Sequence, residues 1–170
     1  MAFEFQAGMR LTAARMQEGQ TRLIEQGTDG ATVTNSTLTD SNIVVPIVAN
    51  ALYVYELYIA YTASSWTGSA GGFQWLWTPT SAIRDRHAHF LARNNTSEDN
   101  STGGPYLNRA MSPTTAVVAG GAGSQFRSIF ESGKMQDTVD RNVTLQYAVG
   151  TGTGSATIRS NSWVRVTRVQ

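Results

Sequence analysis

The sequence predicts an all-β protein built as an antiparallel sandwich, and three observations favour this fold class. Residues 52–62 read LYVYELYIAYT, a run of aromatic, β-branched and other apolar residues that suits a pleated surface better than a helix. Charged residues make up only 15% of the chain, which contains 16 glycines, a composition typical of many short strands joined by turns. No helical segments lie between the strand-like ones, which argues against a parallel sheet.

The strand at residues 52–62 is expected to lie inside a sheet, with both of its faces covered. One face holds Tyr53, Tyr55, Leu57, Ile59 and Tyr61, and the other holds Leu52, Val54, Glu56, Tyr58 and Ala60. Both sets are mostly apolar, whereas a strand with one wet face alternates apolar and polar residues. Because a carboxylate is expensive to bury alone, we expect Glu56 to pair with Arg141 or Arg165 rather than act as a general acid.

Length, charge and cysteine content limit the possible partners. A chain of 170 residues can form one domain that buries roughly 70% of its unfolded surface. A net charge of +1 argues against nucleic acid as a partner, and the absence of cysteine excludes disulfides and thiolate chemistry. Pro46, Asn50 and Glu56 interrupt the apolar runs, so we expect no membrane span and no membrane partner.

Residues 1–30 are predicted to form an N-terminal docking arm with a short helix, and residues 31–170 the sandwich domain. Residues 1–9 suggest an extended arm anchored by Phe3 and Phe5. Residues 12–26 are the only helix-like segment, with Gly27 where a helix would stop. The apolar stripe of this helix is thin, so both an arm that becomes ordered against another body and a plain surface helix remain open.

The other strands follow from a period of two. Residues 42–48 form a strand with Pro46 at an edge or a bulge, because proline cannot donate to the ladder. Residues 138–149 alternate most clearly, with Val139, Val143, Leu145, Tyr147 and Val149 facing in, and Arg141 among them. Residues 114–123 are expected to form a short strand that runs into a glycine turn. Further strands are expected at residues 155–159 and 162–169, and at residues 124–132, where Phe126 and Phe130 share a face. About eight strands with one long connection favour a sandwich of the jelly-roll type.

Three aromatic residues, Phe73, Trp75 and Trp77, share one face of a strand at residues 73–78. We interpret them as core or interface residues, with a carbohydrate-stacking platform as the alternative. His87 and His89 share a face with Asp85 and could ligate a metal if symmetry supplied further ligands. The preferred interpretation is a solvent-exposed segment that binds no metal, because the sequence offers no third ligand nearby.

No catalytic constellation is apparent, so we expect neither an enzyme nor a cofactor. The glycine-flanked serines do not form a GxSxG nucleophile elbow, and the polar loop at residues 94–104 lacks the lysine of a phosphate-binding loop. A hydrolase is therefore the least favoured hypothesis.

Three segments carry a resemblance to a known group of proteins. Residues 143–169, VTLQYAVGTGTGSATIRSNSWVRVTRV, resemble the closing hairpin of small virion proteins of tailed bacteriophages. Residues 7–16, AGMRLTAARM, are similar to the arm that opens many of these proteins, and residues 51–63, ALYVYELYIAYTA, to their tyrosine-rich central strand. Residues 79–123 take no part in the resemblance.

The resemblance implies a C1q-like or tumour-necrosis-factor-like jelly roll that assembles as a homotrimer and decorates the capsid surface of a virion. The implied partners are identical subunits and the major capsid protein. Contact with the capsid is expected from Phe3, Phe5, Leu11 and Met16. Trimer or core contacts are expected from Tyr53, Tyr55, Glu56, Tyr58, Tyr61, Tyr147 and Trp163. The alternative is a tail-associated or fibre-associated module of the same fold that binds a host surface glycan through exposed aromatic residues and the loop at residues 94–104.

Overall fold

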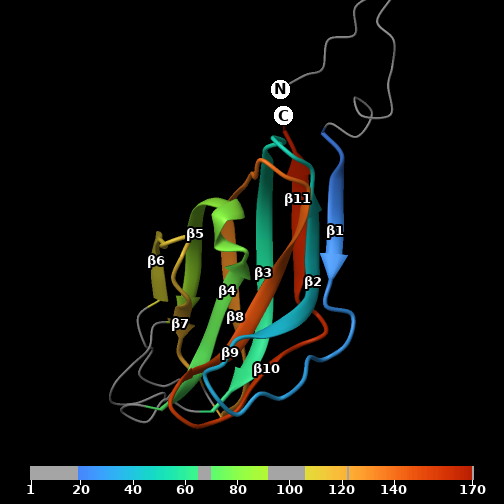
Figure 1. The fold of residues 1–170 in the computed structure, drawn as a ribbon. Helices are drawn as coiled ribbons and strands as arrows, with labels where there is room; N and C mark the ends of the chain where they lie inside the picture. Colours follow the sequence, from blue (N-terminus) through green and yellow to red (C-terminus); the bar gives the residue numbers. More distant parts are fainter. Residues whose placement is uncertain (1–18, 65–69, 92–105, 122, 170) are drawn as a thin grey trace, which may run out of the picture.

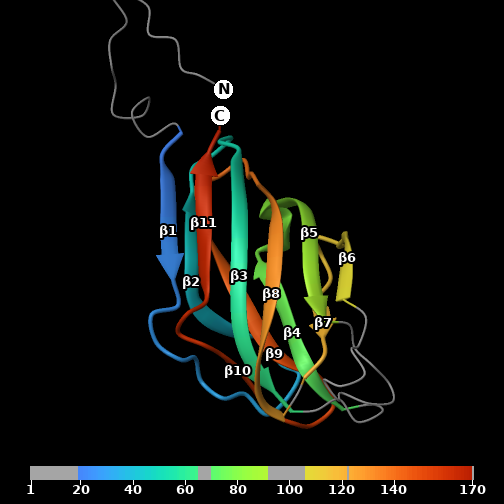
Figure 2. The ribbon, with the colours of Figure 1, turned by 180° about the vertical axis from the view of Figure 1, so that it is seen from behind.

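The computed structural model describes residues 19–64, 70–91, 106–121 and 123–169, which form two antiparallel sheets facing each other (Figures 1 and 2). The strands in these residues are β1 (Thr21–Glu25), β2 (Thr39–Ile47), β3 (Tyr53–Ala63), β4 (Gly71–Thr78), β5 (Ile83–Leu91), β6 (Tyr106–Ala110), β7 (Val117–Ala119), β8 (Gly123–Met135), β9 (Arg141–Thr151), β10 (Ala156–Ile158) and β11 (Trp163–Arg168). A 3-10 turn, η1 (Thr80–Ala82), precedes β5. The predicted all-β antiparallel sandwich is therefore confirmed.

The strand order distinguishes the two sheets. Sheet A has the order β1, β11, β3, β8, β5, β6, with β10 also paired to β3, and sheet B has the order β2, β9, β4, β7. From β2 to β5, and again from β7 to β10, each strand lies in the opposite sheet from the one before it. The chain thus passes back and forth across the core without helical crossovers. The jelly-roll classification itself stays a prediction.

The core lies between the sheets and is rich in aromatic residues. Phe73, Trp75 and Trp77 of β4 are fully buried, as predicted, and so are the inward residues of β9 from Val143 to Val149. The rings of Tyr61 and Phe73 stack at 4.4 Å between centroids. Edge-to-face and stacked ring pairs of this kind add to the stability that burial provides. Val139 was wrongly predicted to face in, because β9 begins only at Arg141 and Val139 lies in the exposed turn before it.

The face of β3 that points away from the core differs from the prediction. Tyr53, Tyr55, Leu57, Ile59 and Tyr61 are buried against sheet B, whereas on the other face Val54 and Glu56 are exposed and Tyr58 is half-buried. Only the small residues Ala60 and Thr62 are covered on that side. Within a single chain, sheet B covers only one face of β3. The prediction that both faces are covered is thus wrong for the first half of this strand in the single chain.

Where the structure describes the predicted helix, the prediction is wrong. Thr21–Glu25 forms strand β1 at an edge of sheet A, paired with β11 from Thr21 opposite Thr167 to Glu25 opposite Trp163. The thin apolar stripe would bury little as a helix, whereas pairing with β11 satisfies the backbone groups of the segment. Residues 1–18, which include the rest of the predicted helix and the predicted extended arm, lie outside the described residues.

The prediction for Pro46 is confirmed. It lies in β2, the edge strand of sheet B, where it is opposite Asn142 of β9. An edge strand needs backbone donors on one side only, so the missing N–H of proline is tolerated there. In the part of the chain that the structure describes, no helix has the length and apolar character required to span a membrane.

Candidate functional site

The three aromatic residues of β4 do not form a ligand platform. Phe73, Trp75 and Trp77 all point into the core and have no exposed surface. Both indole N–H groups donate to the same carboxylate, that of Glu131 in β8. The alternative interpretation of this trio as a carbohydrate-stacking surface is therefore wrong.

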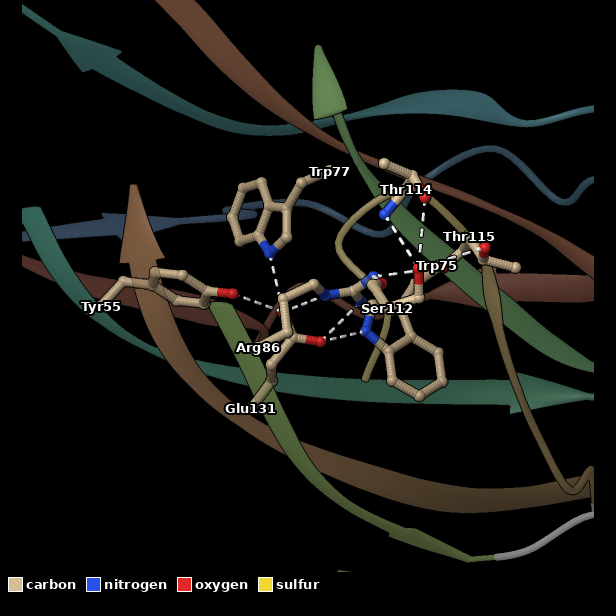
Figure 3. Close-up of polar contacts among 8 residues, drawn as sticks. All are labelled: Tyr55, Trp75, Trp77, Arg86, Ser112, Thr114, Thr115 and Glu131. Carbon is tan, nitrogen blue, oxygen red and sulfur yellow. Dashed lines mark hydrogen bonds and ion pairs between the residues drawn. The ribbon is translucent and has the colours of Figure 1, made fainter. Parts of the chain in front are cut away.

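Glu131 and Arg86 form an ion pair in the centre of the core (Figure 3). Arg86 of β5 donates from Nε to Oε1 at 3.0 Å and from Nη2 to Oε2 at 2.7 Å, and neither side chain is exposed. Tyr55 donates to Oε1 at 2.7 Å, Trp77 to Oε1 at 2.9 Å and Trp75 to Oε2 at 2.7 Å. The carboxylate thus accepts five hydrogen bonds from side chains on three strands.

The rest of the Arg86 guanidinium is also satisfied. Its Nη1 donates to the backbone carbonyls of Ser112 and Thr115, both at 3.4 Å, in the turn between β6 and β7. A buried ion pair is tolerated when hydrogen bonds satisfy its remaining donors and acceptors, as they do here. The pair therefore connects β5, β8 and this turn to the aromatic core, and we interpret it as a structural element rather than a catalytic one.

The pair of Arg86 and Glu131 was not predicted from the sequence, although a signal for it was present. Arg86 alternates in phase with Ala88 and Phe90, and Glu131 is in phase with Ile129 and Met135, all of which face the core. A charge in phase with the apolar residues of a strand, with the opposite charge similarly placed in another strand, indicates a buried pair.

The hydroxyl of Tyr55 should make the protein sensitive to alkali. Burial, and then the charge of Glu131, raise the pKa of Tyr55 well above its ordinary value of 10.0. An unfolded tyrosine ionises near pH 10, so this contribution to stability is complete below pH 10 and decreases as the pH rises toward the folded pKa. We expect urea unfolding to show stability falling between about pH 10 and pH 11, and falling less steeply in Tyr55→Phe. An identical slope in both proteins would contradict this assignment.

The outer face of sheet A is turned toward the viewer in Figure 2. The register of its strands places side chains on this face in rows that cross the strands. Cross-strand pairing places Trp163 of β11 opposite Tyr58 of β3, Tyr58 opposite Phe130 of β8, and Phe130 opposite His89 of β5. We call these four residues the aromatic row. Two residues away on each strand, a second row is paired in the same way and consists of Arg165, Glu56, Ser132 and His87.

Some rings of the aromatic row pack against each other, and some of its side chains are open to solvent. The ring of Tyr58 lies 6.0 Å from that of Trp163, nearly parallel, and 4.9 Å from that of Phe130. Phe130 is 55% exposed and His89 is exposed, whereas Tyr58 and Trp163 are half-buried. Phe126, on the same face of β8, is 66% exposed. Exposed apolar side chains that gather on one face, rather than scatter singly, mark an interaction surface.

An open groove of about 750 Å³ runs beside the aromatic row. Its lining includes Glu56, Arg165, Asp85, Lys134, Ser132 and Thr167. Arg165 is ion-paired with Glu56, and Lys134 with Asp85 at 2.9 Å, all four side chains being about half exposed. Pairs at such exposure typically contribute at most about 1 kcal/mol to stability.

The predicted partner of Glu56 is therefore found, but its environment differs from the prediction. Glu56 pairs with Arg165, one of the two expected arginines, directly across the sheet. Arg141 instead forms an ion pair with Asp137, with 3.1 Å between its Nε and Oδ2 of Asp137. The carboxylate of Glu56 is not buried, because it points to the open face of β3.

The residues singled out in the sequence fall into four groups. Tyr53, Tyr55, Tyr61 and Tyr147 are core residues, whereas Glu56, Tyr58 and Trp163 lie on the outer face of sheet A. His87 and His89 are exposed beside Asp85, and the described residues contain no cluster of three or more acidic or histidine side chains suited to a metal ion. Phe3, Phe5, Leu11, Met16 and the loop at residues 94–104 lie outside the described residues.

Comparison with known proteins gives weak similarities only. No protein-family model and no curated protein matches the chain. Among solved structures, it is similar to the D431N mutant VP2 protein of infectious bursal disease virus in derived T=1 particles, at 12% identity and a TM-score of 0.27 over 99% of this chain and 44% of that one. The VP2 subviral particle of the same virus gives 13% identity and a TM-score of 0.25, over 100% and 46% of the two chains. The protein spans less than half of these chains, and TM-scores this low assign neither a fold nor a function.

Proposed function

We propose that the protein is a structural component of a virus particle: a trimeric decoration protein that docks on the major capsid shell through its N-terminal arm. The observation that carries the proposal is the aromatic row, an exposed apolar surface on a sandwich whose core is already complete. The likeness of residues 7–16, 51–63 and 143–169 to small virion proteins of tailed bacteriophages supports the same role.

Self-association suits the composition of this surface. Tyrosine, tryptophan and arginine are the residues most enriched among those that contribute most to protein interfaces, and Tyr58, Trp163 and Arg165 are neighbours here. A chain without cysteine has no disulfides to stabilise it, so additional buried area between subunits would increase its stability.

The arm is proposed to make the contact with the capsid shell. Residues 1–18 precede β1, the edge strand of sheet A, and carry Phe3, Phe5, Leu11 and Met16. Aromatic and long apolar side chains are suited to filling pockets in a shell protein. Because β1 is part of the sheet, a truncation that tests the arm must end before residue 19.

Deletion of residues 1–18 is expected to leave a folded, associating sandwich that no longer binds capsids. Binding is measured by co-sedimentation of the purified protein with capsids of the encoding virus that lack it. A second variant carries Phe3→Ser and Phe5→Ser in the full-length chain, and it should bind capsids more weakly than the wild type. Undiminished binding of the truncated protein would remove the arm from the mechanism.

The second candidate function is a tail-associated or fibre-associated module that binds a host surface glycan. The groove beside the aromatic row favours it, because sugars stack on aromatic rings and hydrogen-bond to charged pairs such as Glu56 and Arg165. Quantitative mass spectrometry of purified particles separates the two functions. A decoration protein should approach the abundance of the major capsid protein, whereas a tail module should be far rarer.

A further inference from the structure

We infer that the outer face of sheet A is the surface on which a second copy of this chain docks, with the aromatic row at its centre. The inference rests on the self-association in the proposed function and adds the surface and its partner.

The rings form a continuous strip. Trp163, Tyr58, Phe130 and His89 lie on four adjacent strands, so that the strip extends about 14 Å at a strand spacing of about 4.8 Å. The stacking of Tyr58 on Trp163 already restricts both side chains, which reduces the entropy lost when a partner covers them. Phe130, exposed in the middle of the strip, has the most apolar surface to bury.

The charges beside the strip favour a second copy of this chain over a partner whose charges are all of one sign. The groove holds two cations and two anions as neighbouring pairs, Arg165 with Glu56 and Lys134 with Asp85. A nucleic acid or an acidic protein would require an excess of positive charge. A face that carries both signs can meet a second copy of a chain whose net charge is only +1 without strong repulsion.

The size of the face is comparable to that of a standard interface. The residues of its six strands, each occupying about 3.3 Å along the strand and about 4.8 Å across it, cover about 780 Å². A standard interface buries about 800 Å² on each partner. The outer face of sheet B is a weaker candidate, because β9 presents Asn142, Thr144 and Gln146 there.

The test compares Phe130→Asp with Val139→Asp in the full chain by sedimentation velocity over a range of concentrations. Val139 is 48% exposed in the turn between β8 and β9, outside the strands of sheet A, and serves as the matched control. We expect the wild type and Val139→Asp to associate. Phe130→Asp should have the circular dichroism of the wild type and a dissociation constant raised at least about 30-fold.

A charge exchange provides a second test that does not depend on the folding of Phe130→Asp. Glu56→Arg replaces the Glu56–Arg165 pair by two like charges on the face and should weaken association, and adding Arg165→Glu, which restores the pair with its signs exchanged, should recover it. A wild-type protein that stays monomeric would overturn the inference, and so would association that is unchanged in Phe130→Asp. The inference would also be wrong if the wild type were a monomer that binds glycans on an array and Phe130→Asp abolished that binding. A monomer abundant on particles would overturn this inference and the trimer but leave the virion role standing, whereas an associating protein absent from particles would overturn only the virion role.

Discussion

Glu131→Gln is expected to lower the free energy of unfolding by about 3 to 5 kcal/mol, because it leaves the Arg86 guanidinium buried without a counter-charge. Glutamine also places an N–H₂ group where the carboxylate accepts hydrogen bonds from Tyr55, Trp75 and Trp77. The change is measured by urea unfolding at neutral pH, followed by tryptophan fluorescence.

Two controls accompany this prediction. Glu56→Gln breaks the exposed pair with Arg165 and should lower stability by at most about 1 kcal/mol. The double change Arg86→Met with Glu131→Leu removes both charges and should be less destabilising than Glu131→Gln alone. Equal losses for Glu131→Gln and Glu56→Gln would contradict the assigned role of the buried pair.

Gly133→Ala is expected to lower the free energy of unfolding by about 3 kcal/mol through a clash in the centre of sheet A. A Cβ at this position would lie 2.2 Å from the backbone carbonyl oxygen of Asp85 and 2.7 Å from the hydroxyl of Tyr55. Gly133 is paired with Tyr55 of β3 on one side and with Arg86 of β5 on the other. The added methyl group would therefore push apart two members of the buried network.

The matched control for Gly133→Ala is Ser132→Ala, the preceding residue, whose side chain points to the outer face. It should change the free energy of unfolding by no more than about 0.5 kcal/mol in the same urea titration. If Gly133→Ala proved equally mild, the close approach of β5, β8 and Tyr55 at this point would be wrong.

The fold was predictable where the pattern is local. The alternation at residues 52–62, 73–78 and 138–149 places each strand within a few residues of its observed bounds. Strand β1 was not predictable in this way, because its partner Thr167 lies 146 residues from Thr21. A short segment with a thin apolar stripe takes its structure from whichever partner satisfies its backbone.

The candidate site was harder to predict, because a period of two does not say which set of residues faces the core. In β8 the large aromatic residues Phe126 and Phe130 face outward, and the charged Glu131 faces inward. This reversal follows from the position of Arg86 on the neighbouring strand, 45 residues away in sequence, which requires a carboxylate inside. Only the paired register of four strands brings the members of the aromatic row together.

The central claim is that a second copy covers the outer face of sheet A, and hydroxyl-radical footprinting of the wild type at several concentrations tests it most directly. We predict that modification of Phe130, Tyr58 and Trp163 falls as the protein associates, while Val139 reacts at a constant rate. Constant reactivity of the three aromatic residues during association would contradict the claim, because the copies would then meet on another surface.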